Sequence, residues 1–232
     1  MKNLVITTNI KPENGKIPDK PTTFSYTPSI FNVCVESTQK WAQRMGANFL
    51  EVTDDHYFPG WSPTWQRMLM FLDEYKDYDQ IMYCDGDYGV HDLTPNLLSW
   101  TSKQPETFFA VGDLTNKLHK TVDKHFNAGF YVIKKEAINT LRPYYREFMN
   151  KHTKSRYQDQ DCLNDLLNVH KVSFRELSRN WNGLFAVKRP LFCIHYVSIR
   201  KMDFSFEEHT KQMERKMNIL SQMSEEEILN LY

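Results

Sequence analysis

Short apolar runs alternate along this chain with longer segments whose apolar residues recur every three to four positions, and this alternation restricts the fold more than any other feature. The short runs are typical of strands and the longer segments of helices that cover a sheet. Strands that alternate with helices predict an α/β fold, with a mostly parallel central sheet flanked by helices. Because 232 residues supply one substantial hydrophobic core rather than two, we expect a single domain over residues 1–202.

The expected elements follow one another in a regular order. The predicted strands cover residues 4–8, 48–53, 81–85, 108–111, 130–133 and 191–196. The predicted helices cover residues 29–46, 65–75, 138–148 and 162–167. A proline-containing polar stretch over residues 9–28 predicts a long loop, of the kind that covers a site or is disordered.

Residues 203–232 form a helical C-terminal extension of different composition, rich in Glu, Lys and Met, with two capping-box patterns. Met213, Met217 and Leu220 form an apolar stripe, which we expect to pack on the domain or on a second copy of the chain in a homodimer. Peripheral association with a membrane stays open, although the mixed charges give no strong signal for anionic lipid.

Composition gives no indication of several classes of partner. The 29 Lys and Arg residues balance the 29 Asp and Glu residues, which gives no indication of a nucleic acid or an anionic membrane as partner. No apolar stretch is long enough for a signal peptide or a membrane span. The four cysteines are far apart and lack metal-ligand spacing, so we expect reduced core thiols in a cytoplasmic protein.

Residues 83–90 read YCDGDYGV, in which two carboxylates follow an apolar run and are separated by one glycine. Parallel sheets bind ligands beyond the carboxyl ends of their strands, where Asp85 and Asp87 fall. Side chains two apart on an extended segment point the same way, so both carboxylates are expected to converge on one Mg²⁺ or Mn²⁺ ion. Gly86 would let a ligand approach the backbone closely. The alternative interpretation is a loop with solvated or capping aspartates.

Three further segments follow in a fixed order. Residues 126–133 read FNAGFYVI, residues 159–164 read DQDCLN at the start of a helix, and residues 192–201 read FCIHYVSIRK, with His195 at the end of an apolar strand. Together with the aspartate pair, these segments resemble the GT-A fold nucleotide-sugar glycosyltransferases. The resemblance is greatest to the retaining family 8 group, which includes glycogenin and the galactosyltransferases of lipopolysaccharide synthesis. It spans roughly residues 3–201.

The resemblance implies a metal site and a donor site. Asp85, Asp87 and His195 would hold a divalent metal, usually Mn²⁺, on the diphosphate of a UDP-sugar. Without the resemblance, a satisfied core residue is the favoured interpretation of a lone strand-end histidine. The residues implied for nucleotide-sugar binding are Thr7, Thr8, Asn9, Arg67, Asp85, Gly86, Asp113, Ala128, Gly129, Trp181, Asn182, Arg200 and Lys201.

Some of these residues carry a more specific expectation. Thr7, Thr8 and Asn9 match the region that holds uracil and ribose, with Tyr26 as a candidate for stacking on the base. Arg200 and Lys201 would contact the phosphates; a solvated basic turn is the alternative for one of them. Arg67 stands where the family often carries a lysine that faces the phosphates or the sugar, and a surface ion pair is its alternative role.

The residues implied for catalysis are Asp159, Gln160 and Asn127. Asp159 and Gln160 would lie beside the anomeric carbon, although capping of the helix N-terminus also explains an aspartate there. Asn127, with Gly129, would line the donor-sugar and acceptor pocket. The segment from Asn180 to Asn182 resembles the loop that shapes the acceptor pocket, whereas its tryptophan is equally consistent with a place in the core.

The function implied by the resemblance is transfer of a sugar, hexosyl in character, from a UDP-sugar to an acceptor hydroxyl on a glycan, with retention of anomeric configuration. A non-catalytic module that binds nucleotide sugars is one alternative. Phosphatases of the haloacid-dehalogenase type also place two aspartates after an apolar strand, but near the N-terminus, whereas this pair lies at position 85.

Overall fold

The structure is a computed structural model that describes residues 1–11, 28–90, 92, 94–112, 125–155, 158–178, 181, 183–184 and 193–195. For residues 28–30, 183–184 and 194–195 it describes the backbone. Expectations for the 12–27 loop, for the 203–232 extension and for several single residues lie outside this part of the chain. Those single residues are Tyr26, Asp113, Asn180, Asn182, Arg200 and Lys201.

A six-stranded sheet with the order β2-β1-β3-β6-β5-β7 forms the centre of the domain. Its strands are β1 (Asn3–Thr8), β2 (Asn48–Val52), β3 (Gln80–Asp85), β5 (Phe108–Gly112), β6 (Phe126–Lys134) and β7 (Phe174–Leu177). β1 pairs in parallel with β2 and β3, and β5 pairs in parallel with β7, whereas β6 is antiparallel to both of its neighbours. The mostly parallel sheet predicted from the sequence is confirmed, with β6 as the reversed strand within it.

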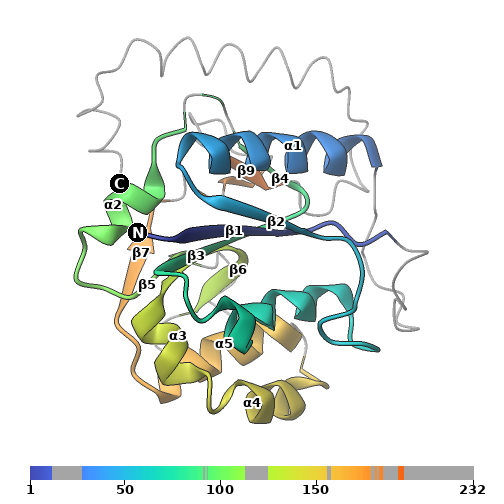
Figure 1. The fold of residues 1–232 in the computed structure, drawn as a ribbon. Helices are drawn as coiled ribbons and strands as arrows, with labels where there is room; N and C mark the ends of the chain where they lie inside the picture. The colour runs from blue at the N-terminus through green and yellow to red at the C-terminus, as the bar shows by residue number, and fades with distance from the viewer. Residues whose placement is uncertain are drawn as a thin grey trace.

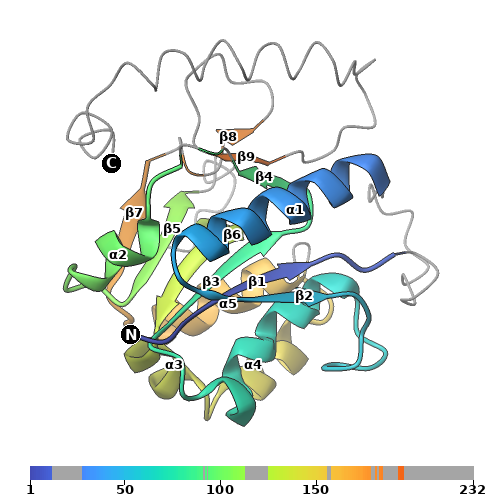
Figure 2. The same ribbon diagram turned by 45° about the horizontal axis from the view of Figure 1, so that its top comes forward.

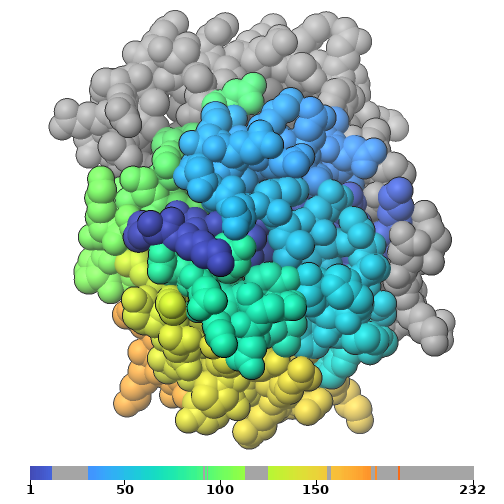
Figure 3. Space-filling view, viewed as in Figure 1, coloured from blue at the N-terminus to red at the C-terminus, as the bar shows by residue number. Residues whose placement is uncertain are grey.

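Helices cover both faces of this sheet (Figure 1). One face carries α1 (Pro28–Arg44) and α2 (Leu97–Ser102). The other carries the 3₁₀ segment η1 (Pro63–Phe71), with α3 (Lys135–Leu141), α4 (Tyr145–His152) and α5 (Gln158–Val169). A shorter 3₁₀ turn, η2 (Asp73–Tyr75), follows η1. In the space-filling view, the start of β1 (dark blue) is visible at the surface, and α1 lies above it (Figure 3).

A second, smaller sheet has the order β4-β9-β8. It consists of β4 (Tyr88–Val90), β8 (Gly183–Leu184) and β9 (Cys193–His195). Figure 2 shows these strands beside α1, and two hydrogen bonds connect β4 to that helix. The Thr38 hydroxyl donates to the Tyr88 carbonyl at 3.2 Å, and the Ser37 hydroxyl accepts from the Val90 N–H at 3.0 Å.

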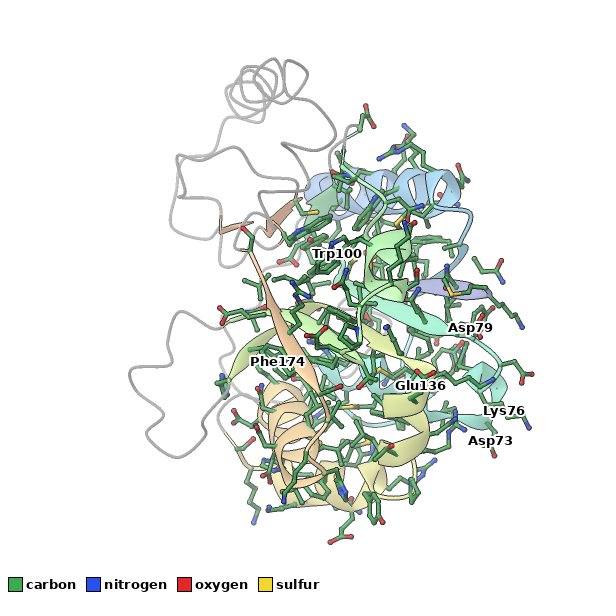
Figure 4. All side chains as sticks on the ribbon, turned by 90° about the vertical axis from the view of Figure 1, so that its left-hand side faces the viewer. Asp73, Lys76, Asp79, Trp100, Glu136 and Phe174 are labelled. Atoms are coloured by element: carbon green, nitrogen blue, oxygen red, sulfur yellow. The ribbon has the colours of Figure 1, made fainter. Side chains whose placement is uncertain are left out.

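The alternation of side chains along each strand divides the core into two clusters. In β3, Ile81 and Tyr83 pack toward η1, α3, α4 and α5, whereas Met82 and Cys84 pack toward α1 and α2. The same division holds at the β7 edge, which Figure 4 faces: Phe174 lies toward α5, and Trp100 of α2 lies on the other side. Side chains at the end of β3 therefore have a fixed direction.

Three elements differ from the predicted ones. The helix predicted over 65–75 is two 3₁₀ segments, because the extended backbone of Leu72 separates them. The helix predicted over 138–148 is split into α3 and α4, because Pro143 lacks the N–H that a continuous helix requires. The FNAG segment lies within β6, whereas the sequence suggested that it precedes the strand.

No helix in the described ranges is both long enough and apolar enough to span a bilayer.

A column of aromatic rings fills the core between α1 and the sheet. Trp41 of α1 stacks on Phe130 of β6 and on Trp181, with centroid distances of 6.4 and 6.0 Å. Tyr88 stacks on the same Phe130 at 4.8 Å, and its hydroxyl donates to the Trp181 carbonyl. The Trp41 indole N–H donates to the Pro95 carbonyl at 3.0 Å. The column joins both sheets to α1.

Replacement of Trp41 by Ala should lower the free energy of unfolding by about 3–5 kcal/mol, because it removes a fully buried ring and leaves a cavity. Urea titration followed by circular dichroism measures this loss. The Val33→Ala variant, at an exposed position of the same helix, serves as the control and should change the value by less than about 0.5 kcal/mol. Equal effects of the two substitutions would contradict the assignment of the column to the core.

Candidate active site

Asp85 and Asp87 lie at the junction of the two sheets. Asp85 is the last residue of β3, Gly86 and Asp87 form a turn, and β4 begins at Tyr88. The segment that the sequence suggested to be extended is therefore a turn between two strands, and β3 ends at Asp85. Asp85 points to the side of η1 and α5, and Asp87 lies close enough to Cys34 of α1 to raise the pKa of that thiol, although burial is the larger cause.

Arg67 of η1 is the centre of a buried polar cluster. Its Nη2 lies 2.9 Å from Oδ1 of Asp85, and its Nε lies 3.0 Å from Oδ2 of Asp159. Nε also donates to the Thr64 carbonyl at 2.9 Å, and Nη1 donates to the Ala128 carbonyl. Only 4% of the residue is exposed, so the surface ion pair considered from the sequence is excluded for Arg67. One cation thus joins β3, α5, η1 and β6.

Tyr83 extends this cluster from within β3. Its hydroxyl lies 2.8 Å from Oδ1 of Asp85 and 3.0 Å from Oγ1 of Thr8, and the Arg67 guanidinium lies 4.7 Å from the centre of its ring. Burial raises the pKa of this phenol, so Tyr83 stays neutral and donates a hydrogen bond to the carboxylate. The Oδ1 atom of Asp85 is consequently fixed from two sides.

The charges in the cluster do not cancel. Burial is the main reason that the pKa of Asp159 is raised to about 6, and the attraction of Arg67 offsets it only in part because Asp85 shares the same cation. Burial also opposes the charge on Arg67, but the carboxylates of Asp159 and Asp85 outweigh that effect and raise the pKa of the guanidinium. Arg67 is therefore a permanent cation between two carboxylates.

Helix α5 holds the start of β6 through side-chain amides. Gln160 Oε1 accepts from the Ala128 N–H at 3.0 Å. Asn164 Oδ1 accepts from the Phe126 N–H at 2.9 Å, and its Nδ2 donates to the Phe126 carbonyl at 3.1 Å. Asn127 Oδ1 accepts from the Gly129 N–H at 2.9 Å. The DQDCLN and FNAG segments are therefore in direct contact.

Gly86 has a packing reason to be glycine. A Cβ atom at this position would collide with the Thr8 carbonyl oxygen and would lie 2.9 Å from a ring carbon of Phe31. The end of β1 and the helix α1 therefore approach the turn more closely than any side chain allows. This close packing accounts for the glycine in D-G-D, independently of a ligand.

The residues expected to hold the base and ribose lie at the carboxyl end of β1 and just beyond it. Thr7 is fully buried, and Thr8 contacts Tyr83 as described above. The Asn9 side-chain amide donates to Oε1 of Glu51 at 2.7 Å, and the Asn9 N–H donates to the Val52 carbonyl at 2.8 Å. The structure thus brings this segment to the same sheet edge as Asp85.

The backbone register brings His195 near one of the expected metal ligands. β9 is antiparallel to β4, and His195 is opposite Tyr88, one residue from Asp87. The His195 side chain lies outside the described residues, and the described residues include no group of three His, Cys, Asp or Glu side chains arranged around one point. The backbone register and the chemistry of two carboxylates and an imidazole nevertheless fit a Mn²⁺ or Mg²⁺ ion.

Trp181 occupies the core rather than a surface. Its side chain is fully buried and stacks on Trp41 and Phe130, as the sequence allowed for an aromatic residue in this loop.

Sequence reasoning missed Tyr83, Thr64 and the role of Asn164. The signal for Tyr83 was its position two residues before Asp85, which places both side chains on one face of β3. The signal for Asn164 was its place as the last residue of the DQDCLN segment. Thr64, which hydrogen-bonds to Asp159 through its side chain and to Arg67 through its carbonyl, carries no pattern in the sequence.

The raised pKa of Asp159 predicts a pH-dependent stability. The pKa is about 6 in the folded chain and about 3.9 when unfolded, so the folded chain binds this proton more tightly. The stabilisation that this proton gives to the folded chain is complete below about pH 4 and is lost as the pH rises through about 6. The free energy of unfolding then decreases by about 3 kcal/mol at most. Urea titrations between pH 4 and 8 should show that Asp159→Asn removes this decrease, whereas Glu136→Gln, at an exposed position, follows the wild type.

Replacement of Arg67 by Met should lower the free energy of unfolding at pH 7 by about 3–5 kcal/mol, because it leaves the buried carboxylate of Asp159 and that of Asp85 without their shared cation. The double variant Arg67→Met/Asp159→Asn should recover part of the loss. Lys40→Met, which removes an exposed ion pair with Glu36 of α1, is the control and should cost less than about 1 kcal/mol. Similar costs for the two single variants would show that the cluster does not stabilise the fold.

Comparison with solved structures shows the same arrangement of elements in glycosyltransferases. One is a glycosyltransferase involved in the glycosylation of the major capsid of PBCV-1, with a TM-score of 0.58, 12% identity, and coverage of 93% of this chain and 100% of that chain. The galactosyltransferase LgtC, solved with donor and acceptor sugar analogues, gives 0.56 and 16% identity over 99% of this chain and 100% of that chain.

The apo form of the glycosyltransferase GlyE of Streptococcus pneumoniae TIGR4 gives a TM-score of 0.56 and 17% identity over 99% of this chain and 62% of that chain. No protein-family model and no curated protein matches the sequence. At such low identities the likeness concerns the fold. The chain therefore has the GT-A fold of these glycosyltransferases, as its motifs predicted.

Proposed function

We propose that this chain is a metal-dependent glycosyltransferase that moves a sugar from a UDP-sugar to a hydroxyl group of a glycan acceptor, with retention of anomeric configuration. The observation that supports this most is the convergence of three motifs on one cation: Arg67 contacts Asp85, Ala128 and Asp159. A structural core needs no such group, because a buried ion pair is costly compared with apolar packing. Such a buried cluster of charged groups is typical of a functional site.

Asp85, Asp87 and His195 would hold the Mn²⁺ or Mg²⁺ ion on the diphosphate of the donor. When bound, the ion supplies Lewis-acid stabilisation for the negative charge that grows on the departing diphosphate. Arg67 and Tyr83 fix Oδ1 of Asp85, so this carboxylate is oriented before any ligand arrives. Arg200 and Lys201 would add positive charge on the phosphate side.

Asp159 is suited to the sugar side of the reaction. The bond to the diphosphate breaks with positive charge on the anomeric carbon, and a nearby carboxylate stabilises that charge. Above its pKa of about 6, Asp159 carries the required negative charge, and its ion pair with Arg67 keeps it in one orientation. Gln160 and Asn127 are both tied to backbone N–H groups of the FNAG segment, so they present fixed groups to a sugar.

The retention of configuration rests on the resemblance to the family 8 enzymes. In that scheme the acceptor hydroxyl attacks from the same face as the departing diphosphate, and a phosphate oxygen takes its proton. The C–O bond to the acceptor forms as the bond to UDP breaks, so UDP and the glycosylated acceptor are the products. No side chain of this chain is assigned as a general base.

The test is release of UDP from a panel of UDP-sugars in the presence of Mn²⁺, with GDP-sugars for comparison. We expect slow release that depends on the metal and that Asp87→Asn lowers by about 100-fold or more. Asp92→Asn, at an exposed carboxylate after β4, is the control and should retain wild-type release. Proton NMR of the glycoside formed with an added acceptor reports the anomeric configuration.

Two outcomes would contradict the proposal. Hydrolysis of a generic phosphate ester with no response to nucleotide sugars would indicate a phosphatase. Binding of a UDP-sugar without turnover of any donor, even with acceptors present, would indicate a binding module.

A further inference from the structure

The first residues of β6 extend beyond the end of β3. The pairing between the two strands ends at Cys84 and Phe130, so residues 126–129 continue past the last paired residue of that neighbour. On the other side, Phe126 is paired with Gly112 of β5, beyond an irregularity in the register between Ala110 and Gly112. This projecting segment carries Asn127 and Ala128, which the proposed function places at the donor sugar. On the side where β3 has ended, groups other than a paired strand must bind its backbone.

Helix α5 has the spacing to replace a strand there. Residues four apart on a helix are separated by about 6 Å along its axis, and residues two apart on a strand by about 6.7 Å. Gln160 and Asn164 are four apart, and the residues that they hold, Ala128 and Phe126, are two apart. The two amides run antiparallel to the strand, as a neighbouring strand of opposite direction would.

Asn164 makes more of the hydrogen bonds that replace strand pairing than Gln160 does. It accepts from the N–H and donates to the C=O of Phe126, which is the pair of hydrogen bonds that a strand residue exchanges with its partner. Nδ2 also donates to the Gln160 carbonyl at 2.8 Å, so the Asn164 side chain is hydrogen-bonded both to Phe126 and to the preceding turn of α5. The residue is 1% exposed, so a ligand does not reach it.

We infer that Asn164 is a positioning residue of the transferase: it fixes the register of the FNAG segment against α5, and thereby the places of Asn127, Ala128 and Gln160 at the donor sugar. This inference rests on the proposed function. Asn164 acts through the Phe126 backbone and contacts no ligand. Its loss should therefore impair turnover of the donor, while the binding of UDP and Mn²⁺ through other residues is retained.

The test compares Asn164→Asp with the wild type. The substitution preserves size and the acceptor for the Phe126 N–H, but places a carboxylate oxygen against the Phe126 carbonyl. We expect the turnover number for UDP-sugar to fall by about 10-fold or more, because small displacements of reacting groups are costly. Hydrogen exchange of the Phe126 and Ala128 amides should become about 10-fold faster or more, and the Kd for UDP with Mn²⁺ should change by less than about 2-fold.

Asn168→Ala is the matched control, because Asn168 lies one turn further along α5 and its amide donates to the Asn164 carbonyl at 2.7 Å. It should leave turnover and the exchange of both amides unchanged. Asn164→Ser, which is too short to bridge both groups of Phe126, repeats the test if the Asp variant does not fold.

Several results would overturn the inference. These are unchanged turnover in folded Asn164→Asp, lost turnover with unchanged amide exchange, or a failure of both Asn164 variants to fold, which would make the residue a requirement for stability alone. Absence of turnover in the wild type with every donor would refute the proposed function, and the inference with it. The wild-type assay therefore distinguishes a failure of the proposed function from a failure of the inference about Asn164.

Discussion

One guanidinium determines how the rest of this sheet edge is arranged. Arg67 is buried, and groups from three other elements contact it: the end of β3 through Asp85, the start of α5 through Asp159, and the start of β6 through the Ala128 carbonyl. A cation removed from water must be surrounded by acceptors in good geometry. That requirement fixes the relative positions of segments that lie almost a hundred residues apart in the chain.

The reversed direction of β6 makes this convergence possible. Ligand-binding groups usually follow the carboxyl ends of parallel strands. β6 enters the sheet at the edge where β3 ends, so its first residues, rather than its last, lie beside Asp85. The two motifs thus meet because the aspartate motif lies at the end of β3 and the FNAG motif lies at the start of β6. α5 then carries Asp159 and Gln160 to the same place.

Much of the fold was predictable because it depends on the alternation of apolar residues, which is local. The same alternation placed Asp85 at a strand end. The site was less predictable, because its geometry depends on contacts between distant segments. A turn at Gly86 separates Asp85 from Asp87, the partners of Arg67 come from three other elements, and no pattern in the sequence marks β6 as antiparallel. The break of the predicted 138–148 helix was readable from Pro143, since its missing N–H is a property of the residue itself.

The hydrogen bonds between the side-chain amides of α5 and the start of β6 have a consequence for access to β6. A further strand beside the projecting end of β6 would satisfy its backbone along the whole length and would cover it. Gln160 and Asn164 instead contact it at two points, Ala128 and Phe126, from the side of the helix layer. The intervening Asn127 keeps its side chain only partly buried. The end of a strand can in this way be held by a helix and still present a side chain between the two residues that the helix holds.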